Sequence, residues 1–245
     1  LAGGIPNEDA QSFVFDATSL FERDKFSGFD RTEGGIRANV GLRYTGNYDN
    51  GLTTQFAFGQ SYHLAGLNSF AAPDLSQATR NSGLEEDVSD FVAMGGLAYN
   101  GLSLATSARF DKNDFRAERT DVRAGFTKNH ISTSLTYSEI KAPRPNTYAE
   151  DDRREVTGSA SLKIHNYWRA AASASYDLFD KKFNRTAFGL LYEDECFAFA
   201  LAYETTRDDA NTTAQDWKIG ARLSFRTLGD IGGGGVESPL LKSSF

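Results

Sequence analysis

The chain has 245 residues, a net charge of -7, 13% aromatic residues and a mean hydropathy of -0.45. No stretch approaches the ~18 consecutive apolar residues of a membrane helix, and the acidic balance argues against nucleic-acid binding. The first residues, LAGGIPNEDA, lack the basic and apolar regions of a signal peptide, so we expect a mature or truncated chain.

Apolar and polar residues alternate along most of the sequence. This alternation is typical of strands whose two faces meet different surroundings. The runs begin with residues 36–44, continue with two that start near Leu52 and Phe91, and then cover residues 102–110, 122–126, 131–137, 156–164, 168–178, 188–192, 197–203 and 217–225. We therefore predict about eleven strands and no helix.

The two faces of these strands favour a membrane barrel over a soluble sandwich. The apolar faces commonly end in an aromatic residue, such as Tyr44 or Phe225, as at a bilayer interface. The opposite faces carry charges that a sandwich interior could not take unpaired but a wet lumen can. We predict these lumen-facing charges to be Arg109, Arg123, Lys163, Arg185 and Arg222. They fit an anionic cargo or a plug partner, and could equally pair with Asp121, Asp177 and Glu193.

Connection lengths point the same way. Short joints near Asn50, Asn100, Asn129, Asn166 and Asp194 alternate with longer ones at residues 65–88, 111–115, 140–152, 179–182 and 207–212. Outer-membrane barrels combine short periplasmic turns with longer outer loops. The predicted fold class is therefore all-β, a transmembrane antiparallel β-barrel, with a secreted solenoid or sandwich as the alternative. All five prolines fall between strands, as such a sheet requires.

Single-chain bacterial barrels have even strand numbers, so about eleven strands indicate part of a barrel. We predict an extracellular loop segment at residues 1–31, barrel strands at 32–228 and a C-terminal periplasmic tail at 229–245. The first segment is too apolar for a free tail, so we expect it to pack over or into the lumen through Phe13, Phe15, Leu20, Phe21, Phe26 and Phe29.

Three stretches carry motifs of one known family. The first comprises Pro6, Asn7, Glu8, Asp9, Phe15, Asp16, Leu20, Phe21, Phe26, Ser27, Gly28, Phe29, Asp30, Arg31, Glu33 and Gly34. The second is YEDECFAFALAYE at residues 192–204, and the third is RLSFRTLGDIGGG at residues 222–234. Together they resemble the lipopolysaccharide-assembly protein LptD, also called organic solvent tolerance protein.

The resemblance implies the C-terminal part of a 26-stranded outer-membrane barrel, about strands 16 to 26, behind a periplasmic jellyroll that this chain lacks. It implies a translocon in the bacterial cell outer membrane, which inserts lipopolysaccharide into the outer leaflet through a lateral gate. The implied gate strand carries Trp217, Ile219, Ala221, Leu223 and Phe225. The implied partners are lipopolysaccharide, an LptE-like lipoprotein plug and an LptA-like bridge protein, with no cofactor.

Cys196 is the only cysteine. By the alternation of loops its turn is periplasmic, where disulfides form and persist. The acidic neighbours Glu193, Asp194 and Glu195 do not favour a reactive thiolate. The residues alone leave open a buried spectator, a reactive group or half of a disulfide, and the resemblance implies a disulfide to the missing N-terminal part.

Two other function classes bear on this chain. A diffusion porin or another barrel transporter would need a complete, even strand set and a constriction loop, and the sequence shows neither. A barrel enzyme could use Ser61 and His63, which share a strand face, but no orienting carboxylate is evident nearby. We therefore predict a protein that is not an enzyme. His63, His130 and His165 lie too far apart to hold a metal, so we also predict no metal ion.

Overall fold

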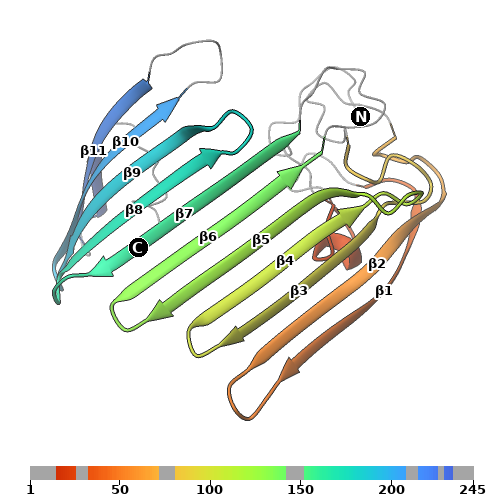
Figure 1. Cartoon of the computed structure of the whole chain (residues 1–245), viewed down its shortest axis with the longest axis horizontal. Coiled ribbons are helices and arrows are strands. Elements are labelled where there is room, and N and C mark those ends of the chain that lie inside the picture. Colours follow the sequence, from red (N-terminus) through yellow and green to blue (C-terminus); the bar gives the residue numbers. More distant parts are fainter. Residues whose placement is uncertain are drawn as a thin grey trace. The chain divides into compact units, whose positions relative to one another are not determined.

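The computed structural model describes residues 15–25, 33–71, 81–141, 152–207, 215–225 and 229–233. In these ranges the regular structure consists of strands and one short 3-10 helix, η1 (Ser19–Phe21). Figure 1 shows the strands joined in succession by turns and loops. They are β1 (Ile36–Asn47), β2 (Thr53–Ala65), β3 (Phe91–Tyr99), β4 (Leu102–Phe110), β5 (Ala117–Lys128), β6 (Ile131–Ile140), β7 (Arg153–Lys163), β8 (Trp168–Asp177), β9 (Lys182–Glu193), β10 (Phe197–Arg207), β11 (Gln215–Phe225) and β12 (Gly229–Gly233).

Each strand is hydrogen-bonded to the next one along the chain, in the order β1 to β12. The predicted all-β, antiparallel fold class is confirmed. Contacts divide the chain into two compact units. Unit 1 comprises Leu1–Tyr99, Leu104–Val122 and Glu139–Asp152, and unit 2 comprises Asn100–Ser103, Arg123–Ser138 and Arg153–Phe245.

In unit 1, β2 pairs antiparallel with β1 on one side and with β3 on the other. The β1–β2 turn is tight, because the Gly51 N–H donates to the Tyr48 carbonyl at 2.9 Å. Gly51 has a φ of +82°, which a residue with a side chain rarely adopts. The Asn-Gly pair at residues 50–51 predicted this turn.

In unit 2, strands β7 to β11 form a second antiparallel meander. Its register shifts between Ser175 and Tyr176, which marks a β-bulge in β8. Unit 2 also holds the turn between β3 and β4, where Asn100 and Gly101 have φ of +48° and +83°. Two successive positive φ values are typical of the two-residue hairpin turn that Asn-Gly favours.

Large apolar side chains on the strands are exposed, whereas the buried ones form small clusters. Val40, Leu42 and Trp217 are 61%, 64% and 66% exposed. The core cluster of unit 1 consists of Phe15, Ala17, Leu20, Ala57, Phe70, Leu84 and Val92. That of unit 2 consists of Leu191, Ala200 and Ala202. This distribution reverses that of a water-soluble sheet, in which the large apolar residues face the core.

The C-terminal end differs from the prediction. Residues 229–245 were predicted as a tail, but Gly229–Gly233 forms β12 and pairs with the end of β11 from Ala221 to Phe225. The glycine-rich sequence GDIGG has no apolar and polar alternation and low strand propensity. Its strand state therefore comes from backbone pairing with β11, which the sequence pattern does not reveal.

Candidate functional site

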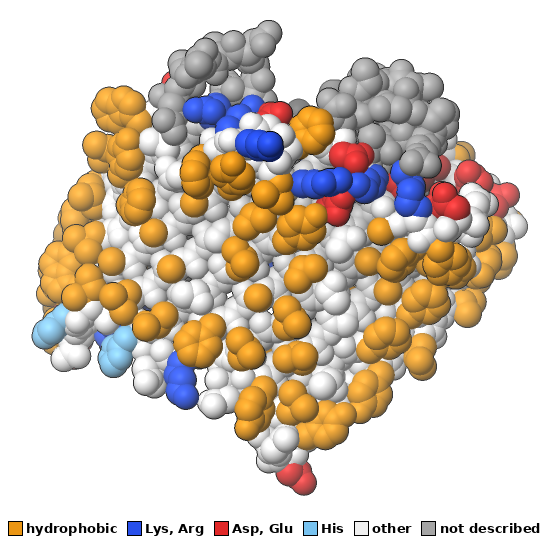
Figure 2. Space-filling view, in the orientation of Figure 1, with side chains coloured by type: hydrophobic (Ala, Val, Ile, Leu, Met, Phe, Trp, Pro, Cys, Tyr) orange, Lys and Arg blue, Asp and Glu red, His pale blue; other side chains and the backbone are white. Residues whose placement is uncertain are grey.

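The register of unit 1 assigns alternate residues of each strand to two faces. Residues directly opposite each other in an antiparallel pair share a face. Gly41 and Gly59 therefore share one face, which we call the polar face, whereas Leu42 and Phe58 share the other, the apolar face. The polar face of β1 and β2 also carries Arg37, Asn39, Arg43, Gln55, Ser61 and His63. Figure 2 shows hydrophobic side chains spread over the viewed face of the strands, with charged groups gathered toward the strand ends.

Unit 2 has the same division. Lys163, Arg169, Leu191, Ala200 and Arg222 are opposite one another in succession from β7 to β11, so they form one row on its polar face. Arg185 lies on this face as well, by alternation with Leu191 along β9. The predicted gate residues alternate with Arg222 and therefore lie on the apolar face, namely Trp217, Ile219, Ala221, Leu223 and Phe225.

The segment before β1 packs onto the polar face of unit 1. A Cβ added at Gly41 or Gly59 would come within 3.0 or 2.5 Å of Leu20 Cδ2. The two opposed glycines thus leave a space, the Leu20 notch, that this side chain fills. Sequence reasoning placed Leu20 in a packed segment but missed the notch. The notch forms because Gly41 lies opposite Gly59, and that position depends on the register of the two strands.

The local sequence shapes this segment before it meets the sheet. The Asp16 carboxylate accepts the backbone N–H groups of Thr18 and Ser19 at 2.8 and 2.9 Å. An aspartate that accepts such bonds favours a turn, and η1 begins there. The turn directs Leu20 toward the notch, whereas Phe21 is 43% exposed.

A buried ion cluster joins this segment to β1 and to the β2–β3 loop. Lys25 Nζ lies 3.5 Å from Glu33 Oε2, and Glu33 Oε1 accepts from Arg37 Nε at 2.6 Å. Arg37 also donates to Asn68 Oδ1 at 3.1 Å, and its guanidinium lies 5.3 Å from the centre of the Phe70 ring. Burial lowers the pKa of Lys25, although the Glu33 carboxylate opposes that shift.

Arg109, one of the predicted lumen-facing charges, is buried at the end of β4 against the β2–β3 loop. Its Nε lies 3.3 Å from Asp90 Oδ2, and its Nη2 donates to Asn81 Oδ1 at 3.0 Å. Burial raises the pKa of Asp90 to about 6, with Asp111 and Glu85 adding to the shift and Arg109 opposing it. The loop thus holds a carboxyl group whose charge changes near neutral pH.

Further polar contacts connect the loops of unit 1. Lys112, in the β4–β5 loop, forms an ion pair with Glu86 and donates to the Val88 carbonyl at 3.3 Å. Asn81 Nδ2 donates to the Lys141 carbonyl at 3.3 Å, which links the β2–β3 loop to residue 141 after β6. These contacts hold the longer connections of this unit together at one end of its strands.

The other predicted lumen-facing charges have different surroundings. Arg185 Nη2 donates to Glu204 Oε2 at 2.8 Å across β9 and β10. Asp121, one of the acids considered as a partner, contacts Arg119 at 2.7 Å. Arg123 is exposed on β5, and Lys163 is exposed at the end of β7. The polar faces therefore combine paired charges with exposed cations.

Cys196 lies in the β9–β10 turn as a free, exposed thiol. Its backbone N–H donates to Asp194 Oδ1 at 2.8 Å, and the Phe197 N–H donates to the same oxygen at 2.9 Å. Asp194 therefore fixes the turn, while the thiol remains exposed. The acidic residues beside the cysteine thus have a structural role in this turn.

Ser61 and His63 share the polar face of β2 but make separate contacts. The Ser61 hydroxyl is fully buried and donates to Asn39 Oδ1 at 2.6 Å. His63 Nδ1 lies 3.2 Å from Asp87 Oδ1, so the structure supplies a nearby carboxylate that the sequence did not reveal. Among the residues described here, no three His, Cys, Asp or Glu side chains are placed to hold a metal ion.

The family-motif residues at the start of the chain, Pro6, Asn7, Glu8, Asp9, Gly28, Asp30 and Arg31, lie outside the described residues. Of the same motif, Phe15 and Leu20 take part in the packing on the polar face, and Asp16 forms the turn before η1. The described parts of the chain contain no helix of the length and apolarity needed to cross a membrane.

Comparison with known proteins agrees with the motif resemblance. A family model described as LptD, LPS transport system D, matches residues 2–168. The LPS-assembly protein LptD of Alcanivorax borkumensis is 24% identical over 246 residues, an alignment that includes 98% of this chain. The chain spans 30% of the length of that curated relative.

Proposed function

Because this chain belongs to the LptD family, we propose that it forms part of a bacterial outer-membrane barrel that delivers lipopolysaccharide to the outer leaflet. The exposed apolar face carries this proposal. Val40 and Leu42 in unit 1 and Trp217 in unit 2 are more than half exposed, on strands whose other face is polar. A transmembrane strand has this alternation, because one face meets hydrocarbon and the other meets the lumen.

We further propose that β11 borders the lateral gate. Trp217 and Ile219 are 66% and 55% exposed on its apolar face. β12 pairs only with Ala221–Phe225, so the described residues provide no strand on the outer side of residues 215–220. The proposed opening therefore lies along the first half of β11. An edge with unpaired backbone groups is the part of a sheet that exchanges partners most readily.

The proposed partners are lipopolysaccharide, an LptE-like lipoprotein plug and an LptA-like bridge protein that would act through a domain outside this chain. Arg123 on β5 and Arg222 on β11 support a plug contact, because each lies on the lumen-facing side of its strand in the proposed barrel. We also propose a disulfide between Cys196 and a cysteine in the N-terminal part of the full-length protein, since the Cys196 thiol is exposed in a short turn.

A diffusion porin is the second candidate. A porin keeps a water-filled path along its polar face. In unit 1 that face is instead covered by the cluster of Phe15, Leu20 and Phe70. The covering favours a barrel that admits a specific cargo over one that passes small solutes freely.

A charged substitution on the apolar face tests the membrane part of this proposal. Leu42→Lys places an ammonium group where we expect lipid, which costs about 2 to 4 kcal/mol near the bilayer midplane. We expect less folded full-length protein in the outer membrane and proportionally less lipopolysaccharide at the cell surface. Arg43→Lys, one residue away on the polar face, is the matched control. Equal amounts of folded protein and surface lipopolysaccharide in both variants would contradict the proposal.

A further inference from the structure

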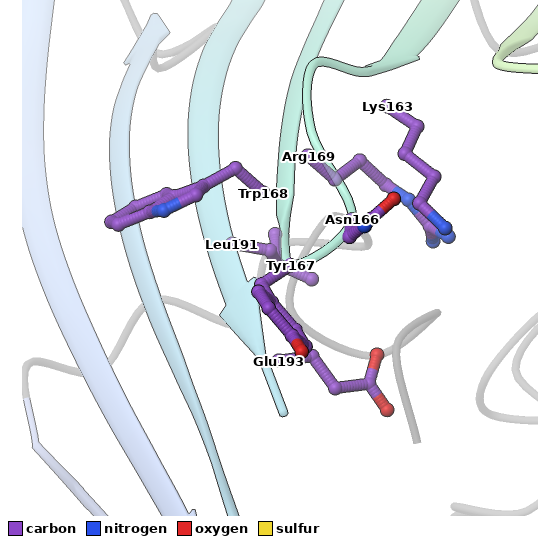
Figure 3. Close-up of a pocket in the computed structure, with 7 residues that line it drawn as sticks. All are labelled: Lys163, Asn166, Tyr167, Trp168, Arg169, Leu191 and Glu193. Carbon is purple, nitrogen blue, oxygen red and sulfur yellow. The ribbon is translucent and has the colours of Figure 1, made fainter. Parts of the chain in front are cut away.

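A small pocket lies at the β7–β8 turn of unit 2. Its volume is about 80 Å³, enough for a group of several heavy atoms, since one water needs about 10 to 15 Å³ by the same measure. Figure 3 shows Lys163 and Arg169 extending in the same direction, with the Asn166 amide beside them. The Glu193 carboxylate lies at another part of the pocket, and Leu191 adds an apolar side.

Lys163 and Arg169 are an unusual pair. They stand directly opposite each other in the β7–β8 register, and both are exposed. Like charges directly opposite each other in a sheet repel and destabilise it. Among the described residues, no carboxylate forms an ion pair with either head group. This differs from Arg185 on the same face, which has Glu204 as its counter-charge at 2.8 Å.

We propose that this pocket binds a phosphate group through Lys163 and Arg169, with Asn166 as a further hydrogen-bond donor. A phosphate monoester carries a charge of about -1.5 to -2 at pH 7, which balances two adjacent cations. A guanidinium binds two phosphate oxygens at once, and an ammonium adds a compact point charge. A bound phosphate would therefore remove the repulsion between the two strands.

The carrier of this phosphate is a phosphorylated glycolipid, and that part of the inference rests on the proposed function. The pocket lies at the short-turn end of β7 and β8, which the proposed topology assigns to the periplasm. Glycolipid on its way to the outer leaflet arrives on that side. Leu191, 6% exposed, lines the same pocket and gives it an apolar side.

The test uses purified full-length protein with its lipoprotein partner in detergent. The double variant Lys163→Gln, Arg169→Gln is compared with Arg153→Gln, Lys181→Gln, which removes the same charge from exposed positions at the other end of these strands. The probes are inorganic phosphate, intact lipopolysaccharide and lipopolysaccharide stripped of its phosphates. Binding of inorganic phosphate is measured by ³¹P line broadening. Heat-modifiable gel mobility shows whether each variant folds, and Lys163→Arg should bind as the unmodified protein does.

We expect the first double variant to bind inorganic phosphate and intact lipopolysaccharide at least about 10-fold more weakly, with no change for stripped lipopolysaccharide or in the control variant. Unchanged binding of both phosphate-bearing probes would overturn the site. Weakened binding of inorganic phosphate alone would retain the site and overturn the glycolipid as its carrier. If the unmodified protein binds inorganic phosphate but no lipopolysaccharide, the proposed function fails while the phosphate site stands.

Discussion

At the scale of single residues, the β2–β3 loop of unit 1 contains a carboxyl group whose pKa is changed by burial. This is the carboxyl group of Asp90, which is held beside Arg109 in a place that little water reaches. Burial opposes ionisation and the Arg109 guanidinium favours it. Burial is the stronger influence, so the pKa of Asp90 rises to about 6.

This shift predicts how the stability of the β2–β3 loop depends on pH. A pKa raised from 3.8 to about 6 means that the folded loop binds the Asp90 proton more tightly than the unfolded loop does. Loop stability should therefore fall as pH rises between about 4 and about 6, by on the order of 2 to 3 kcal/mol, and stay level above that range. Hydrogen exchange of residues 81–90, corrected for intrinsic rates, should show more protection at pH 5 than at pH 7.5.

Asp90→Asn should remove this pH dependence, whereas Asp114→Asn, at an exposed position of the β4–β5 loop, should retain it. The same pH dependence in Asp90→Asn as in the unmodified protein would show that another group is responsible.

Cys196 provides a second prediction at this scale. Its thiol is exposed in a turn that Asp194 holds in place, and the proposed periplasmic location allows disulfides to persist. Full-length protein should run differently on gels with and without reductant, and Cys196→Ser should abolish the difference. Glu195→Ser, in the same turn, should keep it. A Cys196 thiol that reacts freely with an alkylating reagent in native membranes would count against the bond.

At the scale of elements, the segment 15–25 acts as a cover for the polar face of β1 and β2. Its attachment depends on the Leu20 notch, in which a Cβ at Gly59 would come within 2.5 Å of both Leu20 Cδ2 and the Val40 carbonyl oxygen. Extra atoms in a packed site typically cost about 1 to 3 kcal/mol. The notch thus makes the cover sensitive to a single methyl group.

Gly59→Ala should loosen this cover. We expect faster hydrogen exchange and easier proteolysis of residues 15–25 in the full-length protein. Gly95→Ala is the matched control, because a Cβ at Gly95 would meet Thr106 Cγ2 at an ordinary 3.7 Å. Leu20→Ala should loosen the segment without touching the strands. Equal protection in all three variants would show that the notch does not hold the segment.

The strands could be predicted from the sequence wherever apolar and polar residues alternate. β4 begins and ends at the residues predicted from that pattern. The start of β5 was missed because Glu118, Arg119 and Asp121 leave little alternation there, although Arg119 and Asp121 neutralise each other at 2.7 Å. β12 was missed because its glycines carry no pattern at all.

The candidate site was less predictable than the strands, for a related reason. Gly41 is opposite Gly59, and Arg109 pairs with Asp90. Each of these contacts joins residues about twenty positions apart in the chain. Such contacts depend on strand register and loop path, which periodicity alone does not specify. The motif resemblance identified the family, because it used residue identities rather than pattern.

At the scale of the whole molecule, the chain corresponds to 30% of a longer relative. Among the described residues, large apolar side chains of the apolar face are exposed, whereas the polar face of unit 1 is covered by residues of the same chain. Both features fit one part of a membrane barrel that encloses a selective path. In the proposed barrel, lipopolysaccharide leaves that path beside β11.

A reversible cross-link across the proposed gate tests whether lipopolysaccharide leaves the barrel beside β11. Ile219→Cys lies on β11 outside the part that β12 pairs, and it would be joined by a disulfide to a cysteine in the first barrel strand of the full-length protein. Leu162→Cys, 46% exposed on β7, is the control, because β8, β9 and β10 lie between β7 and the gate strand β11. We predict that the complete cross-link stops lipopolysaccharide from reaching the cell surface and that reduction restores it. Unchanged delivery with complete cross-linking would show that lipopolysaccharide does not leave the barrel beside β11.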